Sequence, residues 1–91
     1  MNKTRRNILS KKVAELETLK SQLESIKEDI ESVHDDEEEA FDSMPESLQD
    51  SERGETMQEN IDSLDDAFSN LDDIISDIDD VIDSLNEVIE R

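Results

Sequence analysis

The sequence predicts an all-α fold, an antiparallel two-helix coiled-coil hairpin, from three observations. Apolar residues repeat with heptad spacing in two separate arrays, one in each half of the chain. The only proline and the only glycine, Pro45 and Gly54, lie between the arrays. Basic residues accompany the first array, and acidic residues accompany the second. Consecutive heptads with charged flanks are typical of a coiled coil, and a short connection makes neighbouring helices antiparallel.

The first array begins at Leu9 and predicts a helix over about residues 4–42. Its two core positions, which we label a and d, are occupied as follows: a by Leu9, Leu16, Leu23 and Ile30, and d by Lys12, Leu19, Ile26 and Val33. Lys12 is the single polar residue in this set. We therefore expect positions a and d to form the buried side of the first helix.

The second array keeps the heptad register more strictly and predicts a helix over about residues 52–90. Position a is occupied by Ile61, Phe68, Ile75, Ile82 and Ile89, and position d by Leu64, Leu71, Ile78 and Leu85. High net charge with low hydrophobicity is also the usual signature of disorder. A disordered chain would not maintain a heptad register, so the periodicity favours the coiled coil.

The connection, about residues 43–51, contains the signals of a helix start. Ser43 is placed to cap a helix, Pro45 suits the first turn, and Glu46 follows three residues after the serine. Folding the chain at Glu46 and Ser47 would place Lys20 beside Asp72, because both residues occupy heptad position e. Such exposed pairs contribute only about 0.2–1 kcal/mol each, so we expect them to select the register while apolar contacts supply the stability.

The composition excludes several classes of function. The chain has 91 residues, 28 acidic and 9 basic side chains, a formal net charge of −19, and no cysteine. Neither a disulfide framework nor a thiolate metal site is therefore possible. No long apolar run predicts a membrane span, and no apolar segment follows the basic start as it would in a secretory signal. We expect a single intracellular domain, with no membrane association.

Catalysis and resident metals are not expected either. A two-helix hairpin offers no pocket that could separate the environments of two carboxylates for acid–base chemistry. Residues 77–83 lack the glycine and the loop of an EF-hand calcium site. His34 has no second histidine to share a metal, so we interpret it as a residue on the flank of the helix. The prediction is a non-enzymatic protein with no cofactor and no metal.

Acidic residues follow the heptads of the second helix and define an acidic face. Residues 1–34 carry 7 basic and 6 acidic side chains, whereas residues 35–91 carry 2 basic and 22 acidic ones. One interpretation is imitation of nucleic-acid phosphates toward a basic groove on another protein. The other is a solvated face that keeps the protein soluble. The acidic face comprises Asp62, Asp65, Asp66, Asp72, Asp73, Asp77, Asp79, Asp80, Asp83 and Glu87.

Position g of the second helix carries an additional apolar stripe that the first helix does not match. The stripe comprises Ala67, Ile74, Val81 and Val88. A three-in-seven apolar face is normal in a four-helix bundle, so a homodimer of two hairpins is expected to cover the stripe. The alternative is an adaptor that grips a partner helix through the same residues.

The basic start of the chain has two interpretations. Lys3, Arg5, Arg6, Lys11 and Lys12 could form an arm that contacts nucleic acid. In an antiparallel hairpin, however, this cluster lies beside the acidic carboxyl end of the second helix, whose dipole attracts cations. The second interpretation is favoured, so no direct contact with nucleic acid is expected.

The segment Met-Pro-Glu-Ser-Leu-Gln-Asp-Ser-Glu-Arg-Gly-Glu, residues 44–55, resembles short acidic coiled-coil proteins of Gram-positive bacteria and their phages. The basic start and the acidic helix before this segment fit the same group. The resemblance implies no known activity or site residues. It implies a context in which small acidic phage proteins inhibit host nucleic-acid enzymes, including restriction and CRISPR nucleases. We therefore expect an inhibitor that blocks a basic nucleic-acid-binding protein.

Overall fold

The computed structural model describes all residues from 1 to 91 and is built from helices alone. Helix α1 spans Lys3–Asp42, α2 is a single turn at Glu46–Gln49, and α3 spans Glu52–Glu90. The all-α prediction is confirmed. None of these helices combines the length and the apolar character that crossing a membrane would require.

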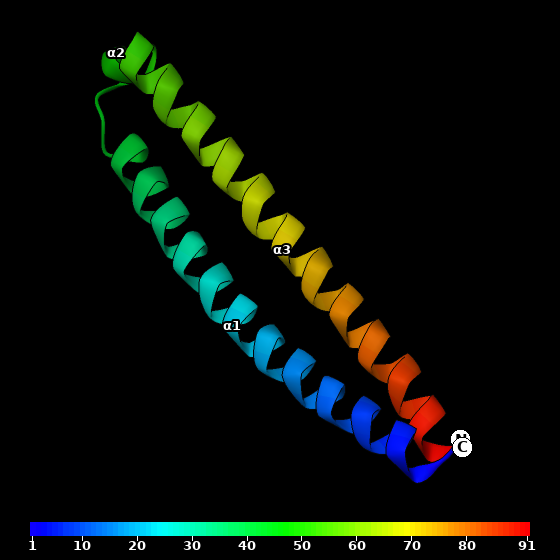
Figure 1. Ribbon diagram of the computed structural model, residues 1–91. Helices are drawn as coiled ribbons and strands as arrows, with labels where there is room; N and C mark the ends of the chain where they lie inside the picture. The colour runs from blue at the N-terminus through cyan, green and yellow to red at the C-terminus, as the bar shows by residue number, and fades with distance from the viewer. The chain divides into compact units, whose positions relative to one another are not determined.

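The contacts within the chain divide it into two compact units. Unit 1 contains Met1–Ser25 and Leu71–Arg91, and unit 2 contains Ile26–Asn70. In unit 1 the start of α1 lies alongside the end of α3, and the two segments run in opposite directions (Figure 1). In unit 2 the end of α1 and the start of α3 are likewise antiparallel and are joined through α2 (Figure 1).

The helix starts are capped differently from the sequence prediction. The expected serine cap at Ser43 is wrong, because Pro45 precedes the first residue of α2 and no side chain caps that turn. Helix α1 is capped by Asn2, whose Oδ1 accepts a hydrogen bond of 2.9 Å from the backbone N–H of Arg5. Helix α3 is capped by Ser51, whose Oγ accepts from the backbone N–H of Gly54 at 3.3 Å. Both caps satisfy amide groups that have no partner within the helix.

A glutamine and a glycine hold the connection of unit 2 together. The side-chain amide of Gln49 donates to the backbone carbonyls of Phe41 and Met44, at 3.0 and 3.2 Å. Gly54 is buried in the first turn of α3, against the backbone of Gln49. In the connection, the carbonyl groups of Phe41 and Met44 are therefore hydrogen-bonded by Gln49, and α2 packs directly on α3.

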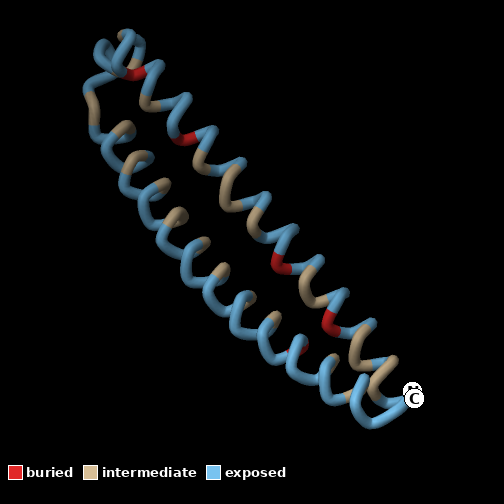
Figure 2. Tube along the Cα trace, viewed as in Figure 1, coloured by how far each residue is buried: buried red, intermediate tan, exposed pale blue.

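In each unit the core is a small set of residues between the facing helices. Ile75 and Ile82 of α3 and Val13 of α1 are buried in unit 1, each with 7–8% of its surface exposed. Ile61 of α3 is buried in unit 2, with 7% exposed. In each unit the buried and half-buried positions of α3 lie on the side toward α1 (Figure 2). The three isoleucines are position a residues, and their predicted burial is confirmed.

The prediction that position d of α1 is buried is wrong, because the neighbouring position e is covered in its place. Leu19, Ile26 and Val33 at position d are 44%, 49% and 56% exposed. Position e is covered instead, with Val13 buried and His34 half-buried. Residues at position e contact α3 either by packing or by ion pairing. Helix α1 is therefore turned about its axis so that position e, and not position d, faces α3. The aliphatic stems of lysines at e cover apolar surface while their ammonium groups stay near water.

The predicted pairing of charges is also wrong, by one heptad. In unit 1 the Nζ atom of Lys20 lies 2.7 Å from Oδ1 of Asp79, not beside Asp72. Acidic residues recur at position e of α3 every seven residues, so a shift of one heptad brings the same kind of group opposite each lysine. The charge pattern therefore identifies the flank on which the helices pair but does not fix the register.

Candidate binding surfaces

The acidic face of α3 contains two parallel rows with different surroundings. Heptad position e carries Asp65, Asp72 and Asp79, and position f carries Asp66, Asp73 and Asp80. Asp66, Asp73 and Asp80 are exposed, and none of these three forms an ion pair within the chain. We call these three residues the outer row.

The e row faces α1, and in unit 1 one of its members is neutralised there. Asp79 is half-buried and bonds to Lys20, whose ammonium also lies 3.8 Å from Glu24. The hydrogen bond to Asp79 raises the pKa of Lys20 most, desolvation opposes the rise, and the attraction of nearby carboxylates adds to it. Asp79 therefore has less negative charge to offer a partner than the outer row has.

The remaining residues of the acidic face lie on the exposed surface of α3. Asp62 accepts a hydrogen bond of 3.1 Å from the side chain of Gln58. Glu87 lies 3.9 Å from Arg91, which is a loose pair between two largely exposed groups. Asp77 and Asp83 are exposed as well. The structure thus brings most of the predicted acidic residues to the surface along one helix.

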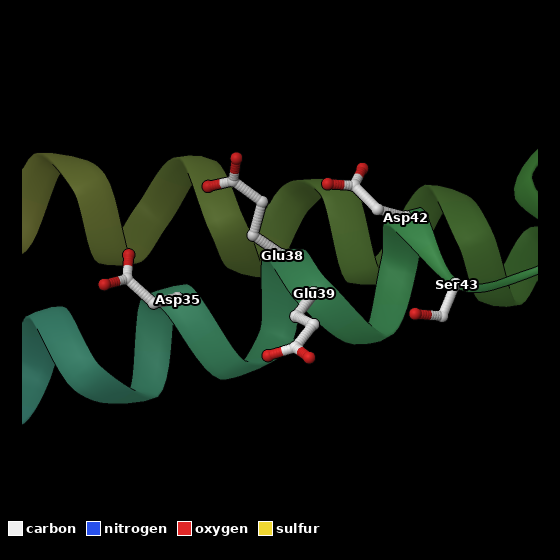
Figure 3. A pocket seen from close by; sticks show the side chains of 5 residues that line it. All are labelled: Asp35, Glu38, Glu39, Asp42 and Ser43. Carbon is white, nitrogen blue, oxygen red and sulfur yellow. The ribbon is translucent and has the colours of Figure 1, made fainter.

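A second concentration of carboxylates lies at the end of α1, in unit 2. Asp35, Glu38, Glu39, Asp42 and Ser43 line a shallow, open hollow of about 360 Å³. Figure 3 shows that the four carboxylates project from the same helix. The last turn of α1 contains no basic residue, so these anions oppose the helix dipole. The segment carries charge at a small cost in helix stability.

The only histidine connects this acidic segment to α3. The ring of His34 meets the ring of Phe68 edge-on, with the ring centres 5.2 Å apart. Its Nδ1 lies 3.0 Å from Asp35, and its Nε2 lies 3.7 Å from Glu38. The interpretation of His34 as a flank residue therefore misses its contact with an aromatic ring of the facing helix.

His34, Asp35 and Glu38 also offer three ligand atoms within 4.8 Å of one another. The two ring nitrogens of an imidazole point in different directions, so a single ion could take only one of them. In this arrangement each ring nitrogen already faces a carboxylate. The geometry suits a protonated imidazole between two anions.

We expect the imidazole of His34 to titrate above its ordinary pKa of 6.5. The hydrogen bond to Asp35 raises the pKa most, desolvation opposes it, and the charges of Glu38, Asp35 and Asp65 add to the rise. Because the pKa is higher in the folded chain than in the unfolded one, the stabilisation is fully present below about pH 6.5. It is lost as the pH rises through the folded pKa.

Nuclear magnetic resonance can follow this titration without ambiguity, because the chain has one histidine. Asp35→Asn should lower the pKa of His34, since it removes the negative charge from the oxygen that accepts a hydrogen bond from the charged ring. Asp73→Asn, the same change at an exposed position of α3 that does not contact His34, should leave that pKa unchanged. A value at or below 6.5 in the wild type would contradict the arrangement.

The exposed apolar surface is larger than the predicted stripe. Of the stripe residues, Ile74 and Val81 are 46% and 49% exposed, while Ala67 and Val88 are half-buried. In unit 2 a separate open groove of about 240 Å³ has an almost wholly apolar lining. The residues that line this groove are Ile26, Asp29, Ile30, Val33 and Leu64. Sequence reasoning missed the contribution of α1, since it assigned position d to the core.

The basic cluster at the start of α1 lies beside the acidic end of α3, within unit 1 (Figure 1). Arg6 is half-buried, and its Nε atom is covered without a hydrogen-bond acceptor. Lys3, Arg5 and Lys11 are exposed. No ion pair joins this cluster to α3, and Lys12 pairs instead with Glu15 of its own helix, at 3.1 Å. Arg6 is only partly accessible for contact with nucleic acid.

No family model matches the chain, and no curated protein or solved structure is significantly similar to it.

Proposed function

We propose that this chain is a non-enzymatic acidic inhibitor that imitates the charge of nucleic acid. It acts in the cytoplasm of a bacterial host and blocks a basic nucleic-acid-binding protein, such as a restriction or CRISPR nuclease. The observation that carries the proposal is the outer row, which is exposed and has no ion pair within the chain. Because unpaired carboxylates remain available, they can replace phosphates in a basic groove.

The spacing and the cost of the outer row support this function. Seven helical residues advance about 10.5 Å, so the row presents carboxylates at regular intervals. Aspartate is a weaker helix former than glutamate or lysine, and like charges one turn apart cost a few tenths of a kcal/mol. Solubility alone would be served by a mixture of signs and by better helix formers. A dedicated binding surface would explain why this face keeps aspartates that each lower the stability of the helix slightly.

The proposal predicts salt-sensitive binding that competes with DNA. The immobilised protein should capture a basic protein from a bacterial lysate, and both NaCl and duplex DNA should displace it. The captured protein is then purified, and its affinity is measured directly. Replacing Asp66, Asp73 and Asp80 together with asparagine should weaken that affinity by at least about tenfold, since three desolvated charge contacts are lost.

A matched control removes the same charge from the other helix. Glu17→Gln, Glu28→Gln and Asp36→Asn, combined, should leave the affinity within about twofold of the wild type, because these exposed residues lie outside the outer row and the change in net charge alone is screened at physiological salt. Circular dichroism checks that both triple variants remain helical. Equal affinity of the outer-row variant and the wild type, or failure of DNA to compete, would refute the proposed function.

The exposed apolar residues support a second candidate function. Ile74 and Val81 are about half exposed, which favours self-association into a four-helix bundle or an adaptor that holds a partner helix. In the adaptor case, changing both residues to asparagine abolishes partner binding, and added salt has little effect. Loss of binding in the outer-row variant together with strong salt dependence would instead identify charge mimicry.

A further inference from the structure

One flank of unit 1 combines exposed apolar residues with an unusual lack of acidic residues. Ile8 and Leu19 of α1 and Ile74 and Val81 of α3 are all about half exposed. Positions d and g of α1, which include Leu19 and Ile8, and position g of α3 lie on the flank opposite the pair of Lys20 and Asp79, which joins the two e positions. Glu15 is the one acidic residue at these positions of α1 in unit 1, and its charge is paired with Lys12 at 3.1 Å. We call this surface the apolar flank.

The acidic residues of α3 avoid the apolar flank. Leu71–Arg91 contains eight acidic residues, and seven of them occupy heptad positions b, e and f. Only Asp77 lies at positions c and g, which otherwise carry Ile74, Val81, Ser84, Val88 and the terminal Arg91. A chain with a net charge of −19 repels its own copies, so a second copy could approach only where carboxylates are absent.

The two helical segments of unit 1 carry opposite charge. Met1–Ser25 has six basic and three acidic side chains, whereas Leu71–Arg91 has one basic and eight acidic. Arg5 and Lys12 occupy position d, on the apolar flank itself, and Lys12 is already paired with Glu15 of its own helix. A second copy can therefore place either like charges or opposite charges against each helix, depending on which helices meet.

We propose that the apolar flank binds the same flank of a second copy, with α1 of each copy against α3 of the other. The inference rests on the self-association proposed above and specifies its geometry. Around the resulting bundle basic and acidic helices alternate, so each acidic α3 segment has only α1 segments as neighbours. The alternative, α3 against α3 and α1 against α1, places like charges side by side.

Sedimentation velocity over a range of protein concentrations at about 150 mM NaCl tests the surface. The wild type should dissociate reversibly from dimer to monomer on dilution. Ile74→Asn combined with Val81→Asn should raise the dimer Kd by at least tenfold, because two apolar contacts per copy are lost. Ser69→Asn combined with Ser76→Asn, at exposed position b, is the control and should leave the Kd unchanged. A wild type that is monomeric at every concentration overturns the proposal.

The pairing of the helices is tested by removing cations from the apolar flank. Arg5→Gln combined with Lys12→Gln should weaken the dimer by about two- to fivefold, the range expected for exposed charge pairs. Lys3→Gln combined with Lys11→Gln removes the same charge away from the flank and serves as the control for net charge. If α1 faced α1, the first variant would relieve repulsion and tighten the dimer relative to this control.

An equal or tighter dimer in the Arg5 and Lys12 variant, relative to the control variant, overturns the α1-to-α3 arrangement. Circular dichroism at matched concentrations confirms that each variant remains helical, so that loss of folding is not mistaken for loss of contact. These measurements use the chain alone. A negative result here would therefore not contradict the charge-mimicry proposal. That proposal is tested by the affinity of the outer-row variant for its partner protein.

Discussion

Replacing Ile75 with alanine should lower the free energy of unfolding by about 2–3 kcal/mol. Ile75 is buried between α1 and α3 in unit 1 and is 8% exposed. The range lies at the lower end of that observed for such substitutions, because no side chain of this thin core is completely enclosed. Few apolar residues are buried, so the loss of one is a large fraction of the stability of a small domain.

The neighbouring residue provides a matched control. Ile74→Ala makes the same chemical change one position away, where 46% of the side chain is already exposed. It should cost less than about 1 kcal/mol, since little apolar surface returns to water and alanine is the better helix former. Both variants are compared by urea unfolding, at a fixed concentration low enough that self-association does not contribute. Equal losses for the two variants would contradict the assignment of the core.

The sequence was a good guide to α3 and a poorer one to α1, for a physical reason. Position a of α3 is isoleucine in four of five heptads, and three of these isoleucines are buried. In α1, position d is apolar, but position e contains Val13, Lys20 and His34, which contact α3 by packing, ion pairing and aromatic contact. A binary apolar pattern counts a lysine or a histidine as outward-facing and so misplaces the rotation of the helix.

The remaining differences have local causes. The caps at Asn2 and Ser51 follow from residue type, and both could have been found by searching for Asn and Ser three positions before a helical amide. The bonding of Gln49 to two carbonyl groups depends on how the chain turns, which no periodicity encodes. For the binding surfaces, the sequence predicts which residues are acidic. It does not distinguish Asp79, bonded across to Lys20, from the unpaired outer row.

Replacing Gly54 with alanine should destabilise the chain by about 1–3 kcal/mol, although alanine is the better helix former by about 1 kcal/mol. A Cβ atom at this position would collide with the carbonyl group of Gln49 and lie only 2.7 Å from the Cα atom of that residue. The obstacle is backbone, which cannot rotate away as a side chain would. Because α2 and α3 approach each other so closely here, the substitution is expected to destabilise the chain and not to stabilise it.

The unfolding measurement is paired with hydrogen exchange, because the two readouts separate a local effect from a general one. In Gly54→Ala the displacement of α2 should break the bonds from Gln49 to Phe41 and Met44, and amide exchange should rise around residues 43–54 first. Ser63→Ala, an exposed position in the same helix, should change the stability by less than about 0.5 kcal/mol. If Gly54→Ala proved as stable as the wild type, α2 could not pack on α3 as closely as the structure places it, and the connection would have to turn in another way.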